Sequence, residues 1–244
     1  MAIRAILFDL GDTLFGLNPY PDDLRPELSR VLADACAANL VPGLAAEVHE
    51  TVLEAWRDSY GPGLTAEVDN AGTIAQVLED ADSMGDVDIS RLSRRLADVF
   101  GRADIGRFNA PEGCGDRVAT FLDRGVSLGL VSNTSTRPEL LKGFMDHVGL
   151  TPSLFRVMLF SVRLGVRKPN PKIYARALAG MGFKPEQTLF VGDRVREDIR
   201  GPMAAGMHAA LTHEYRQEEV GMARPVAVVN ELLDVHQVLR DLGV

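Results

Sequence analysis

The apolar and polar residues of the chain follow two different patterns, and the change falls near residue 110. Between residues 24 and 108, apolar residues recur every three or four positions, which is the spacing of one helix face. The spacing is clearest in the ranges 24–40, 44–56 and 89–100. We therefore expect this part of the chain to be a block of helices without a strand.

Short apolar runs of strand length lie on both sides of this block. They are residues 3–8, 126–132, 157–161, 188–193, 208–212 and 226–229. From residue 111 onward the runs alternate with expected helices, for example over 111–124 and from Asn170 to about Gly182. This alternation predicts an α/β fold, with a Rossmann-like parallel sheet covered by helices on both faces.

The helical block separates the first expected strand from the others, so the sheet domain is discontinuous in sequence. We expect residues 1–17 and 110–244 to form the α/β core, and residues 18–109 to form a helical insertion.

Two local predictions follow from helix chemistry. Thr136 and Glu139 have the spacing of a capping box. Pro202 cannot donate to the Asp198 carbonyl, so a helix should break or restart there.

The charge of the chain argues against nucleic-acid and membrane partners. The 244 residues carry a net charge of −8, so no basic surface for nucleic acid or anionic lipid is expected. No apolar run approaches the roughly 18 residues of a membrane span. The two cysteines form no CxxC pair, which favours a reduced, cytoplasmic setting. The sequence does not indicate an oligomeric state.

Polar residues follow four of the expected strands at the points where the strands end. They are Asp9, Gly11, Asp12 and Thr13 after the first strand, Ser132, Asn133 and Thr134 after the second, Arg167 and Lys168 soon after the third, and Gly192, Asp193, Glu197 and Asp198 after the fourth. The carboxyl ends of parallel strands meet at one edge of a sheet, where ligands bind. These groups should therefore converge.

The chemistry of these groups suits a phosphoryl group. Asp9 and Asp193 offer hard carboxylate oxygens, which suit Mg²⁺ better than a soft metal. Ser132 offers a hydroxyl donor and Lys168 a positive charge, both suited to a tetrahedral anion. A carboxylate beside such an anion can act as a nucleophile and form an aspartyl-phosphate. Asp9 is our candidate for that role.

Four segments, in this order along the chain, carry a resemblance to a known family. They are FDLGDTL, LVSNT, RKPNPKIY and VGDRVREDI. Together they resemble the motifs of the haloacid dehalogenase-like (HAD) hydrolase superfamily. The resemblance implies that the helical insertion is the all-helical cap of this family, which closes over the pocket.

The resemblance also implies roles for individual residues. Asp9 matches the nucleophile, and Ser132, with Asn133 beside it, matches the phosphate-binding hydroxyl. Lys168 matches the lysine that neutralises the nucleophile and the phosphate.

For the metal, Asp9, the backbone carbonyl of Gly11 and Asp193 match the protein ligands of Mg²⁺. Asp198 matches the carboxylate that supports this site.

One position departs from the pattern of the family's phosphatases. They usually carry an aspartate two residues after the nucleophile, as general acid and base, but this chain has Gly11 there and Asp12 one place later. Asp12 is a candidate catalytic residue, although capping of the turn is the favoured interpretation. A general acid contributes typically about 10²–10⁴-fold, so its absence matters.

The leading hypothesis is a Mg²⁺-dependent phosphatase of a small phosphorylated metabolite. Its alternatives are a hydrolase of carbon–halogen or phosphonate bonds, and a protein that binds a phosphorylated ligand but turns it over poorly.

Within the cap, Trp56 is expected in the core, and His49 and Arg57 on a solvated face. The three arginines between residues 91 and 95 are expected at the surface. The pattern assigns no substrate contact to the cap.

Overall fold

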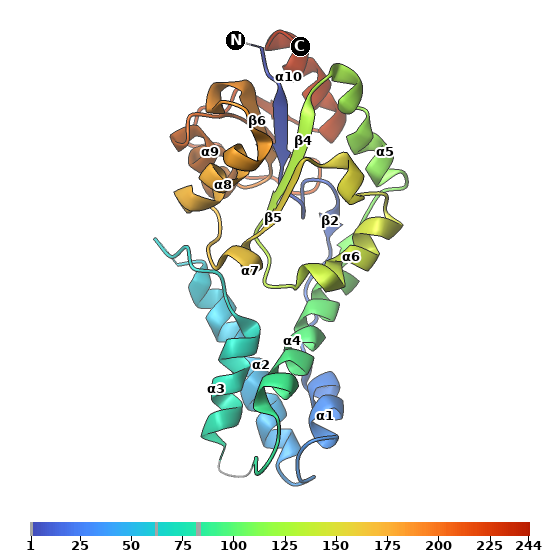
Figure 1. Cartoon of the computed structure of the whole chain (residues 1–244), viewed down its shortest axis with the longest axis vertical. Coiled ribbons are helices and arrows are strands. Elements are labelled where there is room, and N and C mark those ends of the chain that lie inside the picture. The colour runs from blue at the N-terminus through green and yellow to red at the C-terminus, as the bar shows by residue number, and fades with distance from the viewer. Residues whose placement is uncertain (1, 62, 82–83) are drawn as a thin grey trace.

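A six-stranded parallel sheet forms the centre of one half of the molecule (Figure 1). The computed structural model describes residues 2–61, 63–81 and 84–244. The strands are β1 (Ala5–Phe8), β4 (Ser127–Ser132), β5 (Val157–Phe160), β6 (Thr188–Gly192), β7 (His208–Thr212) and β8 (Ala227–Val229). Their order is β5-β4-β1-β6-β7-β8, and every neighbouring pair is parallel. The predicted α/β fold is confirmed, and β1 lies between β4 and β6.

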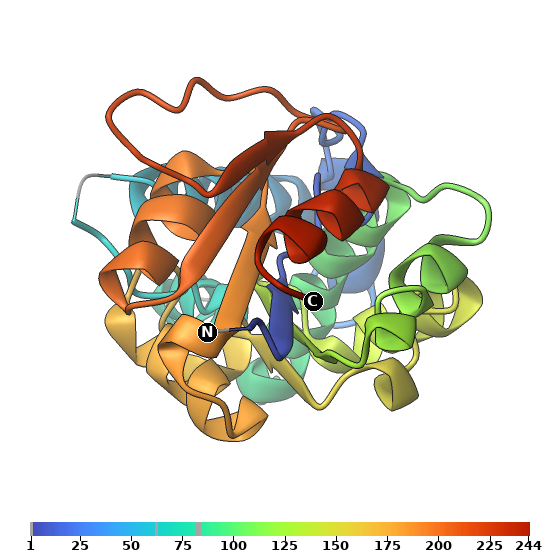
Figure 2. The same ribbon diagram turned by 90° about the horizontal axis from the view of Figure 1, so that it is seen from above.

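Helices cover both faces of this sheet (Figure 2). One face packs against α5 (Cys114–Ala119), α6 (Pro138–His147) and α10 (Val235–Asp241), and the other against α8 (Pro171–Met181). Strand β1 is buried on both sides because Ile6 and Phe8 belong to the first cluster, and Ala5 and Leu7 to the second. A strand buried on both faces is an unbroken apolar run in the sequence, which explains why β1 could be predicted.

The helix expected over 111–124 is shorter than predicted. Only α5 is α-helical there, and a single 3₁₀ turn, Leu122–Arg124, follows it. Two further short helices, α7 (Ser161–Leu164) and α9 (Gly201–Ala204), follow β5 and β6.

The other half of the molecule is a bundle of four helices (Figure 1). They are α1 (Arg25–Ala33), α2 (Val41–Ser59), α3 (Asn70–Asp80) and α4 (Ile89–Gly106). The bundle has its own apolar core, which includes Leu28, Val48, Ile74 and Leu96, each fully buried. None of the helices in the described ranges is long and apolar enough to cross a membrane.

Two short strands, neither of them predicted, connect the halves. Strand β2 (Gly16–Leu17) pairs antiparallel with β3 (Phe108–Asn109). The chain enters the bundle after β2 and leaves it before β3, so we propose this pair as the boundary between a core of residues 1–17 and 110–244 and a cap of residues 18–109.

A second connection joins the cap to the sheet half through backbone atoms. Ala66, in the loop between α2 and α3, forms an isolated antiparallel bridge with Val166. The Glu67 amide donates to the Gly165 carbonyl at 3.1 Å, and the Arg167 amide donates to Thr65 at 2.8 Å. The cap loop is thereby tied to the segment that leads into Lys168.

Of the two local predictions, one is wrong and one is confirmed. Helix α6 begins at Pro138 without a side-chain cap, because the Thr136 hydroxyl instead donates to Asp104 of α4 at 3.0 Å. A long-range contact has replaced the local capping box. Near Pro202, a π-helical segment (Val195–Arg200) ends and α9 restarts at Gly201.

The cap side chains follow the predictions only in part. Arg57 and the arginines between 91 and 95 are exposed, as predicted. His49 is buried rather than solvated, because its ring stacks on Phe100, with the ring centroids 6.4 Å apart. Trp56 is half-buried and donates to Asn70 at 2.8 Å, so it lies at the edge of the core.

Candidate functional site

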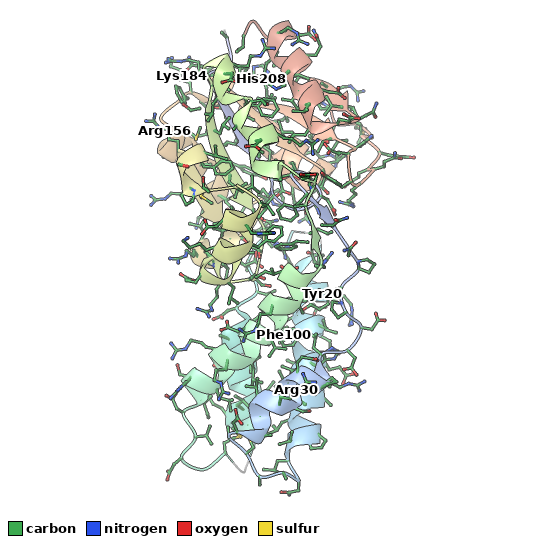
Figure 3. The ribbon with its side chains drawn as sticks, turned by 90° about the vertical axis from the view of Figure 1, so that its right-hand side faces the viewer. Tyr20, Arg30, Phe100, Arg156, Lys184 and His208 are labelled. Carbon is green, nitrogen blue, oxygen red and sulfur yellow. The ribbon has the colours of Figure 1, made fainter. Side chains whose placement is uncertain are left out.

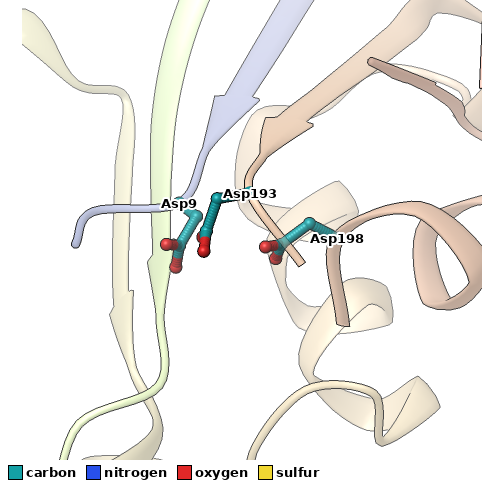
Figure 4. A group of neighbouring side chains, drawn as sticks. All are labelled: Asp9, Asp193 and Asp198. Atoms are coloured by element: carbon teal, nitrogen blue, oxygen red, sulfur yellow. The ribbon is translucent and has the colours of Figure 1, made fainter. Parts of the chain in front are cut away.

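Three carboxylates from separate parts of the sequence meet at the carboxyl edge of the sheet (Figure 4). Asp9 follows β1, Asp193 follows β6, and Asp198 lies on the π-helical segment. Each offers a carboxylate oxygen, and these oxygens lie within 4.8 Å of one another. All three side chains are buried, so their negative charges interact in a poorly hydrated space.

Lys168 is the cation within this cluster. Its ammonium nitrogen lies 2.6 Å from Asp9 Oδ1 and 2.7 Å from Asp198 Oδ1, and the residue is 2% exposed. Burial opposes the charge on Lys168, but Asp198 and Asp9 outweigh it and raise the pKa of the ammonium group. Lys168 therefore stays charged and holds two of the three carboxylates.

The close packing of the carboxylates raises the pKa values of Asp193 and Asp198. Burial, with repulsion from Asp198 and Asp9, raises the pKa of Asp193 to about 8. Burial also raises the pKa of Asp198, to about 6, although Lys168 acts in the opposite direction. At both groups, burial and repulsion between the carboxylates outweigh the nearby positive charges, and a bound cation would relieve this repulsion.

Backbone geometry brings Asp198 close to the end of β6. A Cβ atom on Gly192 would lie 2.4 Å from the Asp198 side chain, so only glycine permits this approach. The Arg194 amide then donates to Asp198 Oδ2 at 3.0 Å. A glycine at the strand end therefore allows the π-helical segment to present its carboxylate beside the strand.

Two further residues, Thr13 and Arg216, contact the cluster. The buried hydroxyl of Thr13 lies 3.4 Å from both Asp9 Oδ2 and Asp193 Oδ1. The guanidinium of Arg216, in the connection between β7 and β8, lies 3.3 Å from Asp193 Oδ2. Thr13 was among the groups expected to converge at this edge, whereas nothing in the sequence links Arg216 to the site.

The residues expected to bind phosphate lie on the same edge, but they differ in their contacts. Ser132 ends β4, is 5% exposed and lines the cavity beside Asp9. Asn133 also lines the cavity, but its side chain accepts from the Lys168 amide at 2.7 Å and donates to the Lys168 carbonyl at 3.0 Å. The structure thus gives Asn133 a contact that positions Lys168.

Gly11 and Asp12 form the turn after β1, and both line the cavity. Asp12 has a left-handed backbone, with φ of 55°, and its Oδ1 accepts from the Leu17 amide at 2.9 Å. These contacts match the favoured interpretation, that Asp12 stabilises the turn.

The site opens into a cavity of about 210 Å³ between the two halves of the molecule. Its wall includes cap and linker residues to which the sequence analysis assigned no contact, namely Tyr20, Trp56, Ser59, Tyr60, Glu67, Asp104 and Arg107. On the sheet side the wall adds Arg167, Arg194 and Glu197, each next to a predicted site residue in sequence. Arg167 and Glu197 were among the groups expected to converge at this edge, and Arg194 could have been inferred from its adjacency to Asp193. No periodic pattern marks the cap residues.

The donor set fits a hard divalent cation. The ligating atoms available from Asp9, Asp193 and Asp198 are carboxylate oxygens, which Mg²⁺ prefers over nitrogen or sulfur donors. In the part of the chain that the structure describes, this is the one acidic cluster close enough to hold a metal.

Comparison with known proteins connects the site to one family. A model of the haloacid dehalogenase-like hydrolases matches residues 3–206. The phosphoserine phosphatase of Thermus thermophilus is 28% identical over 96% of this chain and 98% of its own length. The glyceraldehyde 3-phosphate phosphatase of Methanopyrus kandleri is 27% identical over 84% of this chain and 82% of its own length.

Solved structures with different activities share the fold. A 2-haloacid dehalogenase from Pseudomonas syringae superposes with a TM-score of 0.69 at 21% identity, over 98% of this chain and 99% of the other. A HAD phosphatase from Thermococcus onnurineus gives a TM-score of 0.59 at 19% identity, over 97% of this chain and 98% of the other. Because dehalogenase and phosphatase have the same architecture, the fold alone does not distinguish between the two reactions.

Proposed function

The chain belongs to the haloacid dehalogenase-like hydrolase family, and on this premise we propose that it is a Mg²⁺-dependent phosphatase of a small phosphorylated metabolite. The observation that carries the proposal is the buried cluster of Asp9, Asp193, Asp198 and Lys168 at the sheet edge. The phosphatases of T. thermophilus and M. kandleri match along most of their lengths, and this similarity supports a phosphate ester over an organic halide as the substrate.

Asp9 is the proposed nucleophile. One of its carboxylate oxygens attacks phosphorus in line with the leaving group, and a covalent aspartyl-phosphate forms as the bond to the leaving oxygen breaks. Water then attacks the phosphorus of this intermediate and restores the free carboxylate. The Asp9 amide donates to the Val191 carbonyl at 2.9 Å, which fixes the nucleophile to the neighbouring strand.

Lys168 and Ser132 are the proposed partners of the transferring phosphoryl group. The ammonium group of Lys168, already 2.6 Å from Asp9, is placed to neutralise charge on the phosphoryl oxygens. The Ser132 hydroxyl, at the end of β4, supplies a neutral donor from the adjacent strand. The Asn133 side chain maintains the position of Lys168 through its two backbone contacts.

A Mg²⁺ ion would be held by Asp9, the Gly11 carbonyl and Asp193, with Asp198 in support. When bound, it would supply positive charge that stabilises the phosphoryl oxygens. The close approach of the three carboxylates, whose repulsion helps to raise the pKa of Asp193, supports this assignment.

The substrate is proposed to be small because the cavity holds only about 210 Å³. Several polar and aromatic cap side chains close it on the side away from the sheet, among them Tyr20, Tyr60 and Glu67. This arrangement suits a phosphorylated metabolite and excludes a phosphate carried on a folded protein surface.

Hydrolysis of a carbon–halogen bond is the second candidate, and Gly11 is the observation that favours it. A halide leaves without a proton, so a site that lacks the usual acid could still release it. The retained carboxylates of Asp193 and Asp198 favour the phosphatase, because by family resemblance the dehalogenases need no metal.

The test is phosphate release from an aryl phosphate and a panel of sugar and nucleotide phosphates, with Mg²⁺ and with EDTA. We expect metal-dependent release that Asp9→Asn lowers by more than about 10³-fold. Asp146→Asn, at an exposed aspartate on α6, is the matched control and should retain activity. Halide release from a 2-haloacid without metal would favour the second candidate. Saturable binding of the esters without turnover would instead indicate a phospho-ligand-binding protein.

A further inference from the structure

The space beside Gly11 is filled by an apolar side chain. A Cβ atom on Gly11 would lie 2.9 Å from Leu17 Cδ1, 3.3 Å from Leu17 Cγ and 3.4 Å from Leu17 Cδ2. Leu17 belongs to β2 and lines the cavity. A proton-donating side chain is therefore absent from position 11, and the volume that one would enter is hydrophobic.

Two other carboxylates of the cavity wall are held by contacts with the protein. Asp12 Oδ1 accepts from the Leu17 amide at 2.9 Å. Asp104 Oδ2 accepts from the Thr136 hydroxyl at 3.0 Å, and Asp104 Oδ1 lies 3.7 Å from Arg107. Neither group is free to follow a leaving oxygen without losing these partners.

Glu67 and Glu197 complete the acidic groups of the wall. Glu67 accepts from the Ser161 hydroxyl and lies 3.9 Å from Arg167, so its carboxylate is also engaged. The Glu197 side chain has no hydrogen bond to the residues that the structure describes. Glu197 is the sequence neighbour of Asp198, which belongs to the carboxylate cluster. Glu197 is therefore one acid of the wall that the test must examine, and Asp104, whose pKa is raised by burial, is the other.

Aromatic side chains form part of the cap side of the cavity, beside polar residues such as Glu67 and Arg107. Tyr20 and Trp56 both line it and meet edge to face, with ring centroids 5.2 Å apart. Their polar atoms are used within the cap, because the Tyr20 hydroxyl donates to the Phe100 carbonyl at 3.1 Å and the Trp56 indole donates to Asn70 at 2.8 Å. Figure 3 shows Tyr20 and Phe100 on the cap side of the junction. The two rings therefore offer apolar surface to the substrate.

From these two features, and resting on the proposed phosphatase function, we propose that the substrate is a phosphate monoester of an aryl or enol hydroxyl. Such a hydroxyl is attached to an sp² carbon and has a pKa near 10, as tyrosine does, whereas alkyl hydroxyls are far weaker acids. Its oxygen can depart with the bonding electron pair as an unprotonated anion. The aromatic wall of Tyr20 and Trp56 suits the planar body of this leaving group.

Each step balances without a proton donor at position 11. Asp9 forms a bond to phosphorus as the phosphorus–oxygen bond of the ester breaks, and the aryl or enol anion later takes a proton from water. In the second step, water attacks phosphorus, the bond to Asp9 breaks, and a proton leaves with the products. A group at position 11 would also have acted as base in this step, so hydrolysis of the intermediate should be the slower step.

The experiment measures kcat and kcat/KM for aryl phosphates whose leaving groups have pKa values from about 5 to 10, and for alkyl phosphates of similar size. We expect kcat/KM to be about 10²–10⁴-fold higher for the aryl esters. We expect kcat to be nearly constant within the aryl series, with a burst that approaches one phenolate per enzyme. A difference of less than about tenfold in kcat/KM between aryl and alkyl esters would overturn the inference.

Variants separate the role of position 11 from general damage. Gly11→Asp combined with Leu17→Ala, which makes room for the new side chain, should raise kcat/KM for alkyl phosphates by about 10–100-fold over Leu17→Ala alone. Glu197→Gln and Asp104→Asn should each leave the aryl-to-alkyl ratio of kcat/KM unchanged. A selective loss of alkyl turnover in either variant would identify that residue as the acid and refute the inference. Failure to release phosphate from any ester, aryl esters included, would refute the proposed phosphatase itself.

Discussion

The ammonium nitrogen of Lys168 lies 2.6 Å from Asp9 Oδ1, and the two side chains are 2% and 11% exposed. A charged pair in so little water is strongly coupled, and removing one partner leaves the other as an uncompensated buried charge. The pair therefore links the stability of the protein to the proposed catalytic machinery.

Lys168→Met should lower the free energy of unfolding of the metal-free protein by about 3–5 kcal/mol at pH 8. The loss should be smaller at pH 5, where protonation of the carboxyl groups relieves their repulsion. Urea unfolding in EDTA at both pH values measures this. Lys172→Met, at an exposed lysine of α8, is the control. An equal loss at the two pH values would show that the lysine acts through packing and not through charge.

The metal-free protein should become less stable as the pH rises. Burial and neighbouring carboxylates raise the pKa of Asp193 from 3.8 to about 8, so the folded state holds a proton that the unfolded state has already lost. The contribution of Asp193 to the free energy of unfolding in EDTA should be highest below pH 4. It should fall between pH 4 and about pH 8, by at most about 1.4 kcal/mol per pH unit for one proton.

Chemical denaturation between pH 4 and pH 8 tests this expectation, with Asp193→Asn as the comparison. The variant should show a shallower decline because its amide does not titrate. Saturating Mg²⁺ should reverse the trend, since a cation binds the ionised carboxylates. A stability that rises with pH in EDTA would contradict the assignment of a raised pKa to this site.

Glycines 115 and 143 should respond oppositely to alanine. A Cβ atom on Gly115 would lie 2.3 Å from the Gly149 carbonyl oxygen, and backbone cannot move aside as a side chain can. Gly115→Ala should therefore destabilise the protein by about 3 kcal/mol or more. A Cβ atom on Gly143, in α6, would enter open space, so Gly143→Ala should raise the free energy of unfolding by about 0.5–1 kcal/mol. Thermal unfolding of both variants measures the contrast.

His49 should be replaceable by an apolar ring. Its Nε2 atom is buried and has no hydrogen-bond partner among the residues that the structure describes, which costs free energy, while its ring packs on Phe100. His49→Phe keeps the ring and removes the polar atom, so we expect the free energy of unfolding to rise by about 1 kcal/mol. A loss of more than about 1 kcal/mol, measured by urea unfolding, would show that Nε2 has a partner in solution.

The sheet and the edge where the site lies could be predicted because their signals are local. A strand buried on both faces is apolar throughout, as β1 is from Ala5 to Phe8, and a polar group such as Asp9 marks its end. The parallel order then brings the strand ends together without further information. The contact of Lys168 with Asp9 follows from topology once each lies beyond its own strand.

The features that could not be predicted depend on contacts between distant segments. Thr136 has the right spacing for a capping box but donates to Asp104, which is 32 residues away. Strands β2 and β3 have two residues each, too short for a period-two pattern. The burial of His49 depends on its place in the bundle, since its sequence position alone is compatible with solvent.

The bridge between Ala66 and Val166 determines how far the cavity wall can change without loss of the docked cap loop. Its hydrogen bonds join backbone atoms, so they depend little on which side chains the cap loop carries. Substitutions in this loop can therefore change the cavity wall while the loop remains docked beside Lys168. Main-chain pairing thus holds the loop in place independently of its side chains, so the cavity wall and the docking of the cap could be altered separately by mutation.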